Sequence, residues 1–118
     1  LCTAYNGINI NDRCGSEHPQ YTQQAVIENK SDIGFAFDGD GDRVVAINKM
    51  GVIKNGDHIL ATLLDHLHYT DQPTIVGTEM TNQGLAVYVQ QKNKQLLRTP
   101  VGDVHVIRRL TQENLLLG

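Results

Sequence analysis

Three aspartates at every second position are the residues in this sequence best suited to chemistry. They directly follow the apolar run 33–37, in the order Asp38-Gly39-Asp40-Gly41-Asp42-Arg43. Asp and Gly both disfavour regular structure, so the segment is predicted to be a loop. Residues two apart in a flat strand are separated by about 6.6 Å, but glycine lets the backbone curl until alternate side chains converge. An all-carboxylate site suits a hard divalent cation, so we predict that Asp38, Asp40 and Asp42 bind Mg²⁺.

Two other interpretations of the aspartate run fit the sequence less well. A solvated acidic turn between two strands needs one Asp-Gly pair, whereas this run has two pairs and a third Asp. An EF-hand loop starting at Asp38 would need Gly at its sixth position and Glu at its twelfth. Those positions hold Arg43 and Lys49, and the β-branched residues after the loop favour a strand over a calcium-binding helix. The EF-hand is therefore rejected.

The run from Phe37 to Val44 resembles the metal-binding loop of the α-D-phosphohexomutases. These enzymes transfer a phosphoryl group between the 1- and 6-positions of a hexose through a phosphoserine. Further segments resemble the bacterial phosphoglucosamine mutase branch of that family: Asn6-Gly7-Ile8-Asn9-Ile10-Asn11, Cys14-Gly15-Ser16-Glu17-His18-Pro19, Thr78-Glu79-Met80-Thr81-Asn82-Gln83-Gly84 and Val101-Gly102-Asp103.

The resemblance implies an isomerase that converts glucosamine 6-phosphate to glucosamine 1-phosphate through a bisphosphate intermediate. Its product would supply UDP-N-acetylglucosamine and cell-wall synthesis, and each subunit would use one Mg²⁺. Two alternatives stay open. The first is a phosphomannomutase or phosphoglucomutase with the same chemistry, and the second is a non-catalytic module that binds a divalent cation.

The resemblance also implies roles for residues outside the carboxylates. Arg43 is either a counter-ion of the aspartates or a residue that stabilises the transferred phosphate, and both roles are compatible. The substrate-binding candidates are His18, Gly102 and Asp103. Val104 departs from the family pattern, which commonly has a basic residue there, so a positive charge that could hold a sugar phosphate is missing beside Gly102 and Asp103.

Composition narrows the function classes. The chain has 118 residues and a formal net charge of −3, and its ten Lys and Arg are scattered, which argues against a nucleic-acid partner. No apolar run approaches the length of a membrane span, and no signal-peptide pattern is present. Cys2 and Cys14 are too few for a disulfide framework. We expect a cytoplasmic protein, and the resemblance implies that its partner is a sugar phosphate.

The residues with no assigned chemistry are interpreted structurally. His58, His66 and His68 lack acidic partners at ligand spacing, and Cys14 lacks a nearby base, so none is predicted to be catalytic. No Walker-type glycine-rich loop is present, which excludes an ATP-dependent kinase of that class.

Two consecutive domain parts are expected, with a boundary near residue 55. By the resemblance, residues 1–54 are the C-terminal part of the second phosphohexomutase domain, and residues 55–118 are the N-terminal part of the third. The chain is thus expected to be a fragment of a four-domain enzyme. The phosphoserine, the sugar-binding loop and the last domain would lie outside it, so the chain alone is expected to have no mutase activity.

Hydrophobic periodicity predicts an α/β fold with mostly parallel mixed sheets and flanking helices. Helices are expected at 19–29, 58–68 and 103–113, together with one that carries Leu85 to Val89. Strands are expected at 33–37, 44–48, 52–53, 73–77, 95–99 and 115–117. The first of these strands is expected to be buried, and Asp57 and Thr81 are expected to cap helices.

Overall fold

The chain forms two compact units, Leu1–Gly56 and Asp57–Gly118. The computed structural model describes residues 6, 8–66, 69 and 71–118. The expectations for Cys2, for His68 and for the end of the helix at 58–68 therefore lie partly or wholly outside the described residues.

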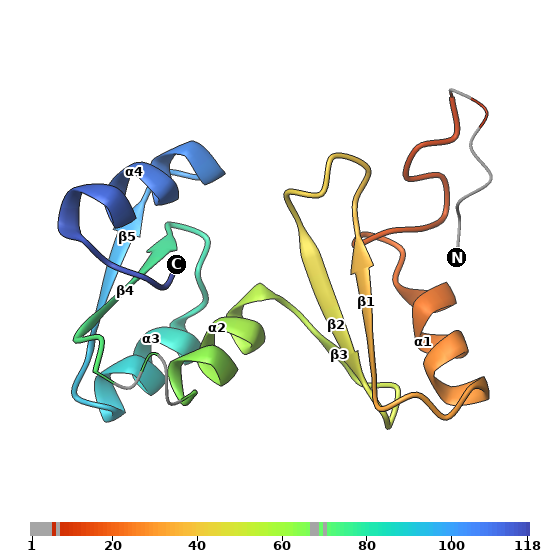
Figure 1. Cartoon of the computed structure of the whole chain (residues 1–118), viewed down its shortest axis with the longest axis horizontal. Coiled ribbons are helices and arrows are strands. Elements are labelled where there is room, and N and C mark those ends of the chain that lie inside the picture. Colours follow the sequence, from red (N-terminus) through yellow and green to blue (C-terminus); the bar gives the residue numbers. More distant parts are fainter. Residues whose placement is uncertain (1–5, 7, 67–68, 70) are drawn as a thin grey trace. The chain divides into compact units, whose positions relative to one another are not determined.

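Unit 1 (Leu1–Gly56) is one helix packed on a three-stranded sheet (Figure 1). Its elements are α1 (Gln20–Glu28), β1 (Ile33–Phe37), β2 (Val44–Asn48) and β3 (Ile53–Lys54). The strand order is β1-β2-β3, and both pairings are antiparallel. The expectation of mostly parallel sheets is wrong for this unit. A six-residue connection between β1 and β2 is too short for the crossover that a parallel pair requires.

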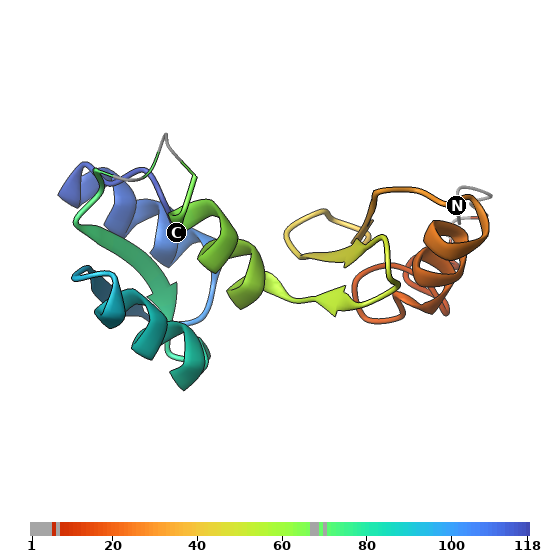
Figure 2. The same cartoon turned by 90° about the horizontal axis from the view of Figure 1, so that it is seen from below.

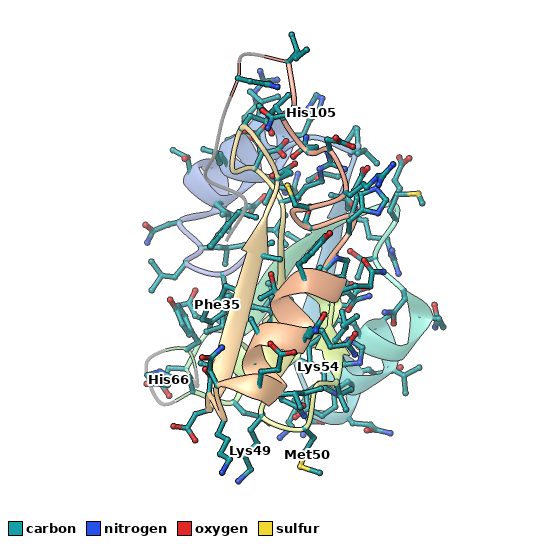
Figure 3. The ribbon with its side chains drawn as sticks, turned by 90° about the vertical axis from the view of Figure 1, so that its right-hand side faces the viewer. Phe35, Lys49, Met50, Lys54, His66 and His105 are labelled. Atoms are coloured by element: carbon teal, nitrogen blue, oxygen red, sulfur yellow. The ribbon has the colours of Figure 1, made fainter. Side chains whose placement is uncertain are left out.

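One face of this sheet packs on α1, and the alternation of side chains along β1 decides which residues do so. A Cβ placed on Gly34 would lie 2.5 Å from the Val26 side chain, so the helix approaches the backbone of the strand closely at this glycine. Val26, Ala36 and Ile47 form the buried core. The side chains of Ile33, Phe35 and Phe37 alternate with these and are more than half exposed. Figure 3 shows Phe35 on the side of β1 away from α1, so the expected burial of the whole strand is wrong.

Unit 2 (Asp57–Gly118) is built around a parallel pair of strands with helices packed on it. Its elements are α2 (Gly56–Leu64), β4 (Thr74–Thr78), α3 (Gln83–Gln91), β5 (Gln95–Thr99) and α4 (Asp103–Glu113). In Figure 2, β4 lies between α3 and α4. The buried core consists of Leu64, Ile75, Leu85, Val89 and Leu117. This unit has the α/β fold and the parallel pairing that the periodicity predicts.

Two expected helix caps and one expected strand are not found in the structure. Asn82, rather than Thr81, caps α3, because its Oδ1 accepts a hydrogen bond from the backbone N–H of Leu85 at 2.9 Å. Asp57 lies inside the first turn of α2, and its carboxylate accepts from the Asn82 side chain at 2.6 Å. Residues 115–117 form no strand. One backbone bond, from Val76 N–H to the Leu117 carbonyl at 2.9 Å, joins this segment to β4.

Within the part of the chain that the structure describes, no helix combines the length and apolar character needed to cross a membrane.

Candidate metal centre

The aspartate run forms the loop of the β1–β2 hairpin. Phe37 pairs with Val44 at the ends of the two strands. The Asp38 N–H donates to the Arg43 carbonyl at 3.3 Å, and the Gly41 N–H donates to the Asp38 carbonyl at 3.2 Å. Gly41 has φ of +75°, a conformation that side-chain-bearing residues rarely adopt, so a glycine is needed where the loop turns back. This curl replaces the flat strand geometry that would keep alternate side chains apart.

The curl brings the three predicted ligands together. One carboxylate oxygen from each of Asp38, Asp40 and Asp42 lies within 4.8 Å of the others. Among the described residues, no other group of three or more His, Cys, Asp or Glu side chains is so arranged. Asp40 and Asp42 are exposed, whereas the Asp38 side chain is 1% exposed. The cluster therefore has one buried and fixed member and two accessible ones.

Arg43 holds the buried member of the cluster. Its backbone N–H donates to Asp38 Oδ1 at 3.0 Å, and its Nε donates to Asp38 Oδ2 at 2.6 Å. Its Nη1 donates to Glu17 Oε1, and its Nε lies 3.6 Å from Asp42 Oδ1. Both oxygens of Asp38 are thus paired by the same arginine, a charge-assisted arrangement that fixes the carboxylate's direction.

These contacts shift the acidities within the loop. Burial raises the pKa of Asp38, but the hydrogen bonds from the Arg43 backbone and side chain and from Asp42 outweigh it and lower the pKa to about 2. The hydrogen bond with Asp38, with burial and the nearby charge of Asp40, raises the pKa of Asp42. Pairing with Glu17, then with Asp38, raises the pKa of Arg43. Asp38 is therefore ionised throughout the physiological range.

The donor set fits a hard divalent cation. All three candidate ligand atoms are carboxylate oxygens, which Mg²⁺ prefers over sulfur or imidazole. Ligands on opposite sides of a Mg²⁺ lie about 4.2 Å apart, because each bond is about 2.1 Å long. A separation of up to 4.8 Å between the carboxylate oxygens therefore needs only small side-chain movements to close. Two of the three side chains are exposed enough to make them.

The other predicted site residues lie in two places. His18 is exposed in unit 1, in the loop before α1, where its backbone N–H donates to the Gly15 carbonyl at 3.2 Å. Gly102 and Asp103 belong to unit 2, at the start of α4. Gly102 has φ of +128°, and Asp103 Oδ1 accepts from the Val104 N–H at 2.7 Å. Their substrate role remains a prediction.

Glu17 is a member of the site that sequence reasoning missed. It is 26 positions from Arg43 in the chain, and no spacing rule connects the two residues. The feature of the sequence that could have pointed to Glu17 was its position in the 14–19 segment, which resembles a family motif. That segment gave no reason to pair this glutamate with the arginine of another loop.

Comparisons with known proteins identify the family. Residues 55–118 match the family model for phosphoglucomutase/phosphomannomutase, alpha/beta/alpha domain III. That match covers more than half of the chain, which therefore belongs to the phosphohexomutase family.

The chain is also similar to proteins named phosphoglucosamine mutase. It is 41% identical over 116 residues to that of Alkaliphilus metalliredigens, covering 96% of this chain and 26% of the relative. It is 43% identical over 113 residues to that of a Psychrobacter species, covering 96% and 25%. The one from Pseudomonas aeruginosa is 41% identical over 120 residues, covering 100% and 27%. The chain thus spans about a quarter of the length of these relatives.

A solved structure is similar in fold. It is a crystal structure of a phosphoglucomutase/phosphomannomutase family protein from Burkholderia thailandensis, with a TM-score of 0.67 and 26% sequence identity. The match covers 84% of this chain and 22% of that one.

Proposed function

We propose that this chain is part of a phosphoglucosamine mutase, which interconverts glucosamine 6-phosphate and glucosamine 1-phosphate. The observation that carries the proposal is the convergence of three carboxylates in the β1–β2 loop of a phosphohexomutase-family chain. The names of relatives that are 41% to 43% identical favour the glucosamine branch. The reaction would pass through a phosphoserine and a bisphosphate intermediate, with the serine supplied from outside the 118 residues.

Each residue of the loop has a distinct part in this proposal. Asp38, Asp40 and Asp42 would hold one Mg²⁺. When bound, the ion would neutralise negative charge on the transferred phosphoryl group and orient it. Arg43 keeps the buried Asp38 ionised and aimed into the cluster through its two hydrogen bonds. Its guanidinium also adds positive charge beside a site whose carboxylates would otherwise repel a phosphate.

The domain layout is part of the same proposal. Residues 1–54 would form the C-terminal part of the second domain of a four-domain enzyme, and residues 55–118 would begin the third. His18 in unit 1, and Gly102 and Asp103 in unit 2, would be substrate-binding residues. The longer protein would act on a sugar phosphate in the cytoplasm and feed UDP-N-acetylglucosamine synthesis.

Asp40→Asn in the longer protein tests the metal role. The change removes one charge from the cluster while keeping side-chain size, so we expect weaker Mg²⁺ binding and a large fall in turnover with the fold intact. Asp32→Asn, an exposed aspartate before β1, is the matched control. Mg²⁺ titrations and rates with glucosamine 6-phosphate measure both effects. Unchanged affinity and rate would leave the aspartates as a structural turn.

A second candidate is a mutase acting on glucose or mannose phosphates, favoured by the name of the matching family model. Rates of the longer protein on glucosamine, glucose and mannose 6-phosphates separate the two. A preference for glucose or mannose phosphate would overturn the assignment to the glucosamine branch. The proposed phosphoryl-transfer reaction would stand. Absence of turnover on all three, with Mg²⁺ still bound, would favour a cation-binding module without catalysis.

A further inference from the structure

A second loop of unit 1, residues 8–18, packs against the aspartate loop. A Cβ on Gly39 would lie 2.2 Å from Ile10 Cγ1, and a Cβ on Gly15 would lie 2.7 Å from the Phe37 carbonyl oxygen. At Gly15 the obstacle is backbone, which leaves no room for a larger residue, whereas at Gly39 it is the end of the exposed Ile10 side chain, which can move. The third contact is the ion pair between Glu17 and Arg43. The aspartate loop therefore takes its position partly from the 8–18 loop.

The ion pair is the one charged link among these contacts. Arg43 uses Nε for Asp38 and Nη1 for Glu17, so its guanidinium bridges the two loops. A guanidinium is planar and rigid, which means that fixing one nitrogen fixes the direction of the others. The direction in which Arg43 approaches Asp38 thus depends on Glu17.

We infer that Glu17 is a positioning residue for the cation site, acting through Arg43. With Glu17 present, the charge of Arg43 is shared between carboxylates on two loops. Without Glu17, that charge falls on Asp38 and on Asp42, whose Oδ1 is already 3.6 Å from Nε. Arg43 then competes more strongly with a cation for the same oxygens. The inference rests on the proposed cation site, and it adds a residue outside the aspartate run to that site.

Mn²⁺ binding to the 118-residue chain tests the inference, with free Mn²⁺ measured by electron paramagnetic resonance. Glu17→Gln is expected to weaken Mn²⁺ binding about threefold to fivefold, the upper part of the range for an exposed ion pair. The matched control is Glu28→Gln. Glu28 is an exposed glutamate of α1 in the same unit, and it accepts from the Gln24 side chain. This control removes the same charge without touching Arg43, so its effect is expected to stay below about twofold.

Two further variants distinguish a direct contact between residue 17 and Arg43 from a long-range effect of the negative charge. Glu17→Asp keeps the charge but shortens the reach, so it should behave like Glu17→Gln if contact with Arg43 matters. In an Arg43→Ala background, Glu17→Gln should have no further effect, because the residue through which it acts is gone. The NMR resonance of the Arg43 Nε–H group gives a readout without metal. It should shift in Glu17→Gln and not in Glu28→Gln, while far-UV circular dichroism stays unchanged.

The outcomes divide cleanly between the two proposals. If Asp40→Asn abolishes Mn²⁺ binding but Glu17→Gln behaves like Glu28→Gln, the role of Glu17 is wrong and the cation site stands. If Glu17→Asp retains full affinity, the effect is long-range charge and the positioning role is overturned. If the unaltered chain binds no Mn²⁺, or if Asp40→Asn binds it equally well, the cation site itself falls, and the role of Glu17 falls with it.

Discussion

At the scale of single residues, the three aspartates of the 38–42 loop differ in burial and in their hydrogen-bond partners. Asp38 is buried and paired through both oxygens, whereas Asp40 and Asp42 are exposed. Their chemical identity and their spacing of two are the same, so the difference comes from Arg43 and from the strand end that carries Asp38. This asymmetry suits a cation site, because one ligand is fixed in advance and the other two can adjust to the ion.

The glycines of the two loops in unit 1 give a residue-scale prediction. Gly15 and Gly41 both have positive φ, of +80° and +75°. A Cβ at Gly41 would meet nothing within 4 Å, whereas one at Gly15 would lie 2.7 Å from the Phe37 carbonyl oxygen. Gly41→Ala should therefore cost about 1 kcal/mol of unfolding free energy from backbone strain alone. Gly15→Ala should cost about 1–3 kcal/mol more, because it also overpacks against backbone.

Urea unfolding followed by circular dichroism measures both variants. Gly56→Ala is the control, because a Cβ there meets nothing within 4 Å and the residue lies in α2. Equal losses for Gly15→Ala and Gly41→Ala would mean that the 8–18 loop does not press on the end of β1.

At the scale of elements, the sequence predicts much of the local structure and less of its assembly. The strands at 33–37, 44–48 and 95–99 and the helix at 103–113 match the structure's β1, β2, β5 and α4 residue for residue. Each has a hydrophobic pattern and a breaker at its ends. The aspartate cluster was equally predictable, because its three carboxylates alternate within residues 38–42 and converge by a local turn.

What the sequence did not give correctly depends on partners elsewhere in the fold. An apolar run does not say which face of a strand is covered, and α1 covers only the face of β1 that carries Gly34 and Ala36, so the sequence does not predict the burial of β1. The direction of β2 was predictable from the length of the loop before it. The pairing of Glu17 with Arg43 was not, because it depends on the tertiary packing of two loops.

The ion pair between Asp65, which follows α2, and Lys92, which follows α3, gives an element-scale prediction of pH dependence. Asp65 pairs with Lys92 Nζ at 2.8 Å and accepts from the Tyr88 hydroxyl. The Lys92 bond, then the Tyr88 bond, lowers the pKa of Asp65 below its ordinary 3.8. A lowered pKa in the folded state stabilises the fold above pH about 4, and this contribution is lost as the pH falls through the lower folded value. Lys92→Met should therefore reduce the difference in unit 2 stability between pH 5 and pH 2.

The size of this effect is limited by exposure. The side chains of Lys92 and Asp65 are 41% and 46% exposed, so solvent screens the pair and the fold should survive its loss. Thermal midpoints at the two pH values measure the effect, and Arg108→Met on α4 controls for removal of a positive charge. If Lys92→Met leaves the stability difference between pH 5 and pH 2 unchanged, the ion pair contributes nothing to the loss of stability in acid.

At the scale of the whole molecule, the chain is two units with separate cores of unequal size. Among the described residues, the core of unit 1 contains Val26, Ala36 and Ile47. That of unit 2 contains five buried residues, of which Leu64, Ile75 and Val89 are at most 1% exposed. The free energy of folding depends on the apolar area removed from water, so the smaller core of unit 1 contributes less to its stability. The proposed cation site lies in this smaller unit.

Hydrogen exchange across the chain tests whether cation binding compensates for that smaller core. Without added metal, the amides of β1 and β2 should exchange faster than those of β4 and β5, because unit 1 opens at a lower free energy. A ligand present at 100 times its Kd adds about 2.7 kcal/mol to the state that binds it. Saturating Mg²⁺ should therefore slow exchange in β1 and β2 by about 100-fold and leave β4 and β5 unchanged. Asp40→Asn should remove this protection, whereas equal slowing in both units would place the ion's main effect outside the aspartate loop.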